Sequence, residues 1–161
     1  MVGTNLKESN LSQADLSGVD LSSVDLYRTN LFGSNLEGAN LSGLNLTKTR
    51  LAKSNLAGAN LDQANLSKND LTGVRFVGAT MVGTNLKESN LSQADLSGVD
   101  LRTQNLRGSL LEGASLVNAN LQGADLTGIT LENANLTDTV LDQVIFCKTI
   151  MPDGAINNTG C

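Results

Sequence analysis

An apolar residue recurs at every fifth position along most of this 161-residue chain. Between Leu6 and Met151 the series contains 30 sites, of which 26 are Leu. A period of five does not suit a straight α-helix, on which successive sites would precess by about 140°, or a straight strand, whose alternate side chains face opposite ways. The backbone must therefore turn regularly so that each segment presents its apolar residue to one interior. This geometry is a coil.

The residues around each apolar site, here called i, repeat in the same phase. The side chain at i−2 is usually small, and the residue at i−1 is Asn or Asp at 21 of the 30 sites. When Met1 is counted as a site of the same series, 14 of the 16 Gly lie at i+2. We expect Asn, Asp and Gly to accept the backbone angles of a corner, which β-branched residues resist. The consensus A(N/D)LxG thus predicts one turn in each five-residue segment.

Segments such as AnLsG at 39–43 and AdLtG at 124–128 resemble the pentapeptide-repeat family across essentially residues 1–151. The resemblance implies an all-β fold, a right-handed quadrilateral β-helix whose coils stack about 4.8 Å apart. Residues 1–21 recur identically at 81–101, an offset of 80 that divides by 20 and supports four segments per coil. We therefore expect a solenoid of about seven to eight coils over 1–151 and a C-terminal capping tail over 152–161.

Apolar sites 20 residues apart should stack as a ladder inside such a solenoid. One expected core ladder consists of Leu6, Leu26, Leu46, Leu66, Leu86, Leu106, Leu126 and Phe146. Burying one Leu contributes roughly 2 kcal/mol, whereas ordering each residue's backbone costs about 1 to 2 kcal/mol. Stability must therefore come from stacking between neighbouring coils, as in other repeat proteins.

One outward column is locally basic, although the chain has a net charge of −5. Arg28, Lys48 and Lys68 lie in it between Glu8 and Glu88. These three basic residues form a candidate site for an anionic partner. The alternative is a solvated charge ladder, because unit charges about 5 Å apart repel by only about 0.8 kcal/mol in water.

The C-terminal end departs from the period at Pro152, the only proline. Both cysteines lie nearby, Cys147 and Cys161. A disulfide between them would fold the tail over the last coil and contribute very roughly 3 kcal/mol; two unpaired thiols in a cytoplasm are the alternative. The tail resembles endings of cyanobacterial and thylakoid-lumen pentapeptide proteins, which implies an oxidising lumen or periplasm. The N-terminal residues show no signal peptide.

The composition argues against several classes of function. Without His, neither a Ser-His-Asp triad nor a Cys-His pair can form, and no Walker loop is present, so we expect no enzyme and no cofactor. The columns of Asn with interspersed Asp suit amide ladders between coils better than a metal site. The acidic net charge argues against direct nucleic-acid binding, and no apolar run is long enough for a membrane helix.

The sequence therefore predicts a non-enzymatic structural or protein-binding solenoid with an unidentified protein partner. Its open ends could also support self-association. The resemblance implies one alternative, a DNA-mimicking modulator of a type II topoisomerase, as in the gyrase-protecting members. The modest net charge and the basic column depart from that pattern.

Overall fold

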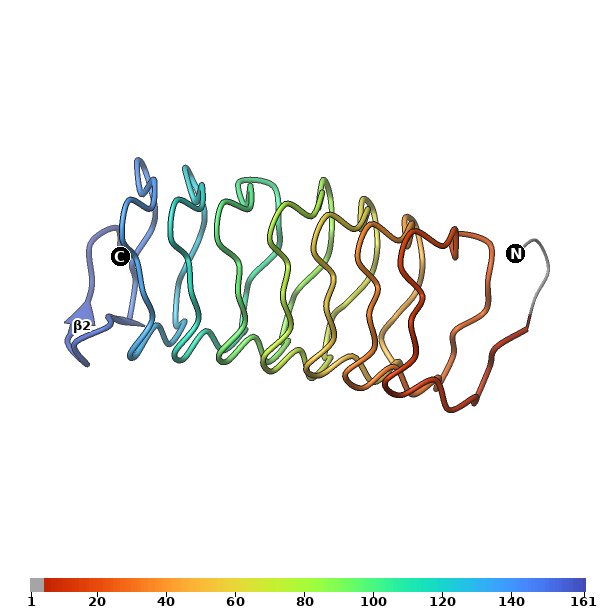
Figure 1. Cartoon of the computed structure of the whole chain (residues 1–161). Helices are drawn as coiled ribbons and strands as arrows, with labels where there is room; N and C mark the ends of the chain where they lie inside the picture. Colours follow the sequence, from red (N-terminus) through yellow and green to blue (C-terminus); the bar gives the residue numbers. More distant parts are fainter. Residues whose placement is uncertain (1–4) are drawn as a thin grey trace.

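The computed structural model describes residues 5–161, which form one continuous solenoid followed by a short C-terminal hairpin (Figure 1). Parallel bridges join residues 20 apart, from Asn5 and Asp25 at one end to Thr130 and Ile150 at the other. Each coil therefore consists of four five-residue segments. The predicted β-helix with four sides is confirmed; residues 1–4 of the predicted solenoid lie outside the described residues.

Each segment contains a tight turn that begins at its apolar residue. In the first described turn, the Ser9 N–H donates to the Leu6 carbonyl at 3.1 Å, and Glu8 has a φ of 59°. A positive φ at the third residue of a turn is the type II geometry, which favours Gly. This explains the prevalence of Gly at i+2.

Asn and Asp at i−1 do not adopt the corner backbone angles that the sequence predicted for them. Their own φ is not positive; instead, their side-chain oxygen accepts a hydrogen bond from the N–H two residues later. The Ser67 N–H donates to Asn65 Oδ1 at 3.1 Å, and the Ser22 N–H donates to Asp20 Oδ1 at 3.0 Å. These residues therefore cap the corner with their side chains. Some also bond between coils, because Asn85 Nδ2 donates to Asn65 Oδ1 at 3.2 Å.

The core ladder runs through the middle of the solenoid. From Leu26 to Leu126 its members are at most 2% exposed, whereas Leu6 and Phe146 at its two ends are only partly buried. Hydroxyl groups at i−2 also point inward, and most bond to a carbonyl of the preceding coil or of their own turn. Thr49 Oγ1, for example, donates to the Leu26 carbonyl at 3.0 Å. The interior thus leaves few polar groups without partners, as a stable core requires.

Three turns within the solenoid break the regular geometry. The i+2 residues Ser23, Lys48 and Thr103 lack the positive φ found at the other turns of the described coils. Bridges are interrupted beside these turns: among the described residues, none joins Asp25 to Asn45, Arg50 to Asp70, or Asn105 to Asp125. Irregular turns therefore coincide with local separation of the coils.

The chain ends in a small antiparallel hairpin against the last coil (Figure 1). Its strands are β1, Thr149–Ile150, and β2, Ile156–Asn157. The Met151 N–H donates to the Ala155 carbonyl at 2.8 Å, and the Phe146 N–H donates to the Thr159 carbonyl at 2.8 Å. Because β1 precedes residue 151 and β2 follows it, the hairpin joins the predicted solenoid to the predicted tail. The boundary between them stays a prediction.

Candidate functional site

The basic residues are concentrated on one edge of the solenoid. Because corner positions 20 residues apart stack, seven of the 11 Lys and Arg residues lie along the same corner. We call this set the basic corner; it consists of Lys7, Arg28, Lys48, Lys68, Lys87, Arg107 and Lys148. Glu8 and Glu88 are the acidic residues at its corner positions. The corner is therefore positive in a chain whose net charge is −5.

Two of the three sequence-predicted site residues have acidic neighbours. Arg28 lies 3.6 Å from Glu8, and Lys68 lies 3.6 Å from Glu88. Hydrogen bonding from Lys87, followed by the charge of Lys68, lowers the pKa of Glu88. All these side chains are well exposed, so each pair contributes only about 0 to 1 kcal/mol. The structure thus places Arg28 and Lys68 in weak pairs that a partner could replace.

The N-terminal part of the corner also carries its only aromatic side chain. Lys7 Nζ lies 5.1 Å from the centre of the Tyr27 ring, and the Arg28 guanidinium lies 5.2 Å from it. Both distances fall within the range of cation–π attraction. Tyr27 therefore helps to hold two of the corner's cations in place.

The third predicted residue, Lys48, lies beside a hollow of about 360 Å³. Lys68 and Arg50 also line it. Among residues 5–161, neither Lys48 nor Arg50 forms an ion pair. Arg50 was not among the residues predicted from the sequence, although its place at i−1, where Asn or Asp is usual, was a signal. The hollow thus lies beside both an irregular turn and this substitution.

A second hollow, also of about 360 Å³, lies beside the irregular turn at Thr103. Its one basic residue, Arg102, is already engaged: Nε lies 3.0 Å from Asp100 Oδ1, and Nη2 lies 2.7 Å from Oδ2. Hydrogen bonding from Arg102 lowers the pKa of Asp100. The two hollows are therefore similar in size and both lie beside an irregular turn, but they differ in available positive charge.

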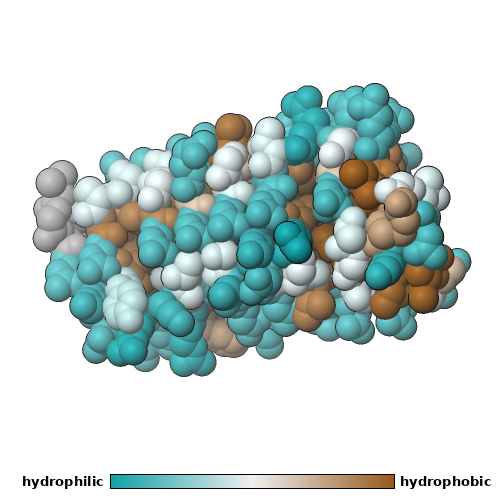
Figure 2. All heavy atoms as spheres, turned by 180° about the vertical axis from the view of Figure 1, so that it is seen from behind, coloured by the Kyte–Doolittle hydropathy of each residue, from teal (hydrophilic) through white to brown (hydrophobic). Residues whose placement is uncertain are grey.

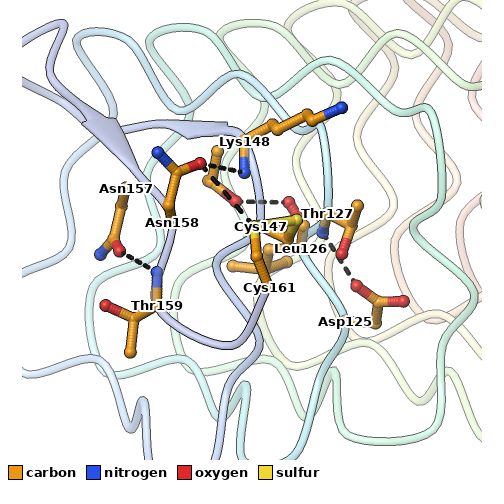
Figure 3. The surroundings of a disulfide bond; sticks show 10 residues. Asp125, Leu126, Thr127, Cys147, Lys148, Asn157, Asn158, Thr159 and Cys161 are labelled. Carbon is orange, nitrogen blue, oxygen red and sulfur yellow. Dashed lines mark hydrogen bonds between the residues drawn. A yellow bond between two sulfur atoms is a disulfide. The ribbon is translucent and has the colours of Figure 1, made fainter.

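The predicted cysteine pair lies where the hairpin meets the last coil (Figure 3). Cys147 and Cys161 form a disulfide with an S–S distance of 2.13 Å. Beside it, the Lys148 N–H donates to Asn158 Oδ1 at 3.1 Å. Covalent and hydrogen bonds together thus attach the tail to the solenoid.

Apolar side chains gather toward this C-terminal end of the surface (Figure 2). Ile156 on β2 is 67% exposed and lines an open hollow of about 810 Å³ with Met151 and Pro152. Leu110, Val140 and Ile145 are also exposed. Self-association through this end stays a prediction.

The described surface offers charged and polar groups in rows rather than a reactive cluster. Residues 5–161 contain no group of three His, Cys, Asp or Glu side chains placed to hold a metal ion. No helix in the same part of the chain is long and apolar enough to cross a membrane. The arrangement therefore suits recognition of charge along an edge.

Comparisons with known proteins agree with this architecture. The family model described as Pentapeptide repeats (8 copies) matches residues 1–38, 29–67, 70–108, 94–133 and 114–151. HetL, a pentapeptide repeat protein involved in heterocyst differentiation regulation from the cyanobacterium Nostoc sp. strain PCC 7120, is 30% identical with a TM-score of 0.75. The match covers 98% of this chain and 80% of HetL.

Two further solved structures are less similar. Full-length QnrB1, a plasmid-mediated fluoroquinolone resistance protein, is 21% identical with a TM-score of 0.51, over 89% of this chain and 84% of QnrB1, which shows a likeness of fold alone. A pentapeptide repeat protein from the Arabidopsis thaliana thylakoid lumen is 31% identical over 74% of this chain and 69% of that one, with a TM-score of 0.32. No curated protein matches the chain.

Proposed function

Because the chain belongs to the pentapeptide-repeat family, we propose that it is a protein-binding solenoid that docks an acidic surface of its partner along the basic corner. The observation that carries this proposal is the segregation of charge. Most of the basic residues share one corner, while acidic residues predominate elsewhere. Such a positive edge steers an acidic partner and fixes its orientation.

The spacing of the coils suits this mode of binding. Successive corner cations are repeated at the distance between stacked strands, about 4.8 Å. One exposed ion pair contributes little, but several along a rigid edge can be formed together by one partner. Arg28 and Lys68 would exchange weak contacts with Glu8 and Glu88 for contacts with the partner's carboxylates. The proposal requires no catalytic group.

Affinity capture from native lysate tests the proposal with two variants of equal net charge. Lys48→Glu/Lys68→Glu reverses two charges on the basic corner, whereas the control Lys53→Glu/Arg75→Glu reverses two elsewhere. We expect the corner variant to lose the partner that the wild type and the control both retain. Equal recovery by all three proteins would reject the basic corner as the docking surface. Matching melting curves would show that all three are folded.

The alternative, a DNA-mimicking modulator of a type II topoisomerase, has weaker support. Acidic residues do exceed basic ones away from the basic corner. However, cations interrupt the acidic columns: Arg75 lies 3.9 Å from Asp95, and Arg102 lies 2.7 Å from Asp100. These pairs break the continuous negative charge that an imitation of DNA requires. A gyrase supercoiling assay decides the point, since unchanged activity on adding the protein removes this alternative.

We also propose an oxidising compartment, a periplasm or thylakoid lumen, in preference to the cytoplasm. The support is the bond between Cys147 and Cys161, because disulfides persist mainly where thiols are not kept reduced. Intact mass after alkylation without reductant, measured on protein from its native source, tests this. Two alkylated cysteines would contradict it.

A further inference from the structure

We propose that the hollow beside Lys48 binds a phosphate-class oxyanion, either free phosphate or a phosphate ester carried by the partner. The hollow lies on the basic corner, so the identity of the partner rests on the proposed function. Binding of the anion itself does not depend on it. Two independent features carry the inference: unused backbone donors and unpaired cations.

The backbone donors are clearest when two stacked coils are compared. One coil further along, the Lys68 N–H donates to the Lys87 carbonyl at 3.0 Å, and the Leu71 N–H donates to the Asn90 carbonyl at 2.7 Å. The Thr72 N–H donates to the capping side chain of Asp70 at 3.1 Å. In this regular coil, all three N–H groups have an acceptor within the protein.

The equivalent N–H groups are those of Lys48 and Ala52, which line the hollow, and of Leu51 beside Ala52; none has an acceptor in the part of the chain that the structure describes. The irregular turn and the missing bridge to Asp70 account for Lys48 and Leu51. Arg50 replaces the usual Asn or Asp and has no oxygen to accept the Ala52 N–H. The Leu51 and Ala52 N–H groups are successive, and adjacent unused N–H groups are the kind of donor that binds anions.

The side chains add positive charge to these donors. Lys48, Arg50 and Lys68 line the hollow. A guanidinium can donate two parallel hydrogen bonds to a phosphate, whereas an ammonium supplies a compact charge. Asp70 also lines the hollow, but its Oδ1 accepts hydrogen bonds from the N–H and hydroxyl of Thr72, at 3.1 and 2.6 Å. Cations therefore outnumber the one carboxylate.

The hollow beside Thr103 shows that an irregular turn is not sufficient. There the Thr103 N–H donates to Gln104 Oε1 at 3.1 Å, and the Val82 N–H donates to Asp62 Oδ1 at 2.8 Å. Arg102 is held by Asp100. The Met81 N–H at this hollow still has no acceptor among the described residues, but the hollow offers no unpaired cation, so it is the internal control for the cations.

Titration of the full chain with inorganic phosphate, followed by amide NMR at constant ionic strength, tests the proposal. We expect saturable shifts at Lys48, Leu51, Ala52 and Asp70, with a dissociation constant at or below about 1 mM. Arg50→Asn removes one cation, restores the consensus capping oxygen and should preserve the fold. It should weaken binding by about tenfold or more, as expected for one charge-assisted contact. The control Arg102→Gln should bind as the wild type does.

A second titration, with O-phosphoserine, distinguishes the two sources of the ligand. Tighter binding than inorganic phosphate would support a phosphate ester on the partner, and the reverse order would support the free anion. The proposal is overturned if no amide shift saturates, or if Arg50→Asn and the wild type bind equally. Because no partner is present, failure here leaves acidic docking along the corner untouched. Failure of the capture experiment likewise leaves phosphate binding untouched.

Discussion

The core ladder and the basic corner run side by side along the solenoid, with Leu66 on the first and Lys68, two residues later, on the second. Leu66 is fully buried and stacks between the equivalent Leu residues of adjacent coils. Lys68 is exposed and pairs with another exposed side chain, that of Glu88. The ladder requires nearly the same residue at each level, whereas the corner tolerates many. The interior therefore determines the fold, and the variable corner is the region that we propose determines what binds.

The largest expected difference between these two regions is in stability. Leu66→Ala leaves a cavity between two stacked coils and should lower the free energy of unfolding by about 2 to 5 kcal/mol. Lys68→Ala removes one exposed ion pair and should change it by no more than about 0.5 kcal/mol. Urea unfolding measures both variants. Similar losses would contradict the division between interior and corner.

The disulfide should contribute less than the interior but more than any corner residue. Replacing Cys161 by Ser releases the tail from Cys147, 14 residues away, and should lower the free energy of unfolding by about 3 kcal/mol. Thermal unfolding of the wild type with and without reductant, beside the variant, measures this. The reduced wild type should resemble the variant. An unchanged melting temperature would show that the hydrogen bonds of the hairpin alone hold the tail.

Backbone strain gives a smaller effect that separates two corner lysines. Lys68 has a φ of 60°, whereas Lys48 does not have a positive φ. Lys68→Gly should be about 1 kcal/mol more stable than Lys68→Ala, because Gly relieves the left-handed conformation. Lys48→Gly should be about 0.5 to 1 kcal/mol less stable than Lys48→Ala. Chemical unfolding of the four variants checks this, and the same sign at both sites would contradict the difference between the turns.

The smallest expected effect concerns the hollow beside Thr103, whose one basic residue, Arg102, is paired with Asp100. Hydrogen bonding from Arg102 lowers the pKa of Asp100 below its ordinary value of 3.8. A carboxyl group with a lowered pKa stabilises the fold above its unfolded pKa and loses that contribution as the pH falls through the lower folded value. Arg102→Gln should raise the pKa of Asp100, measured by NMR titration of the carboxyl carbon. An unchanged pKa would contradict the assigned contact.

Much of the fold could be predicted because one physical requirement repeats at every segment. A buried site every five residues fixes the coil, and the 80-residue offset of the duplicated segment supports four sides. The capping role of Asn and Asp was missed because composition alone does not distinguish a residue that forms the corner from one that caps it. Asn65 caps the corner with its side chain.

The candidate site was harder to predict because it depends on an exception to the repeat. Lys48 and Lys68 occupy the same position of adjacent coils, and their local sequences do not show which turn is irregular. Thr103 was more predictable, since a β-branched residue resists a positive φ. Arg50 could have been recognised as a departure from the Asn or Asp consensus. Its unused charge, in contrast to that of Arg102, required the structure.

The most direct test of the central claim is to map where an acidic peptide binds. Amide NMR during titration of the full chain with a Glu-rich peptide should show shifts along the basic corner, at Arg28, Lys48, Lys68, Lys87 and Arg107. These shifts should weaken steeply as salt is added, because exposed charges are screened. Shifts confined to other faces, or none at low salt, would contradict the assignment of the basic corner as the binding surface.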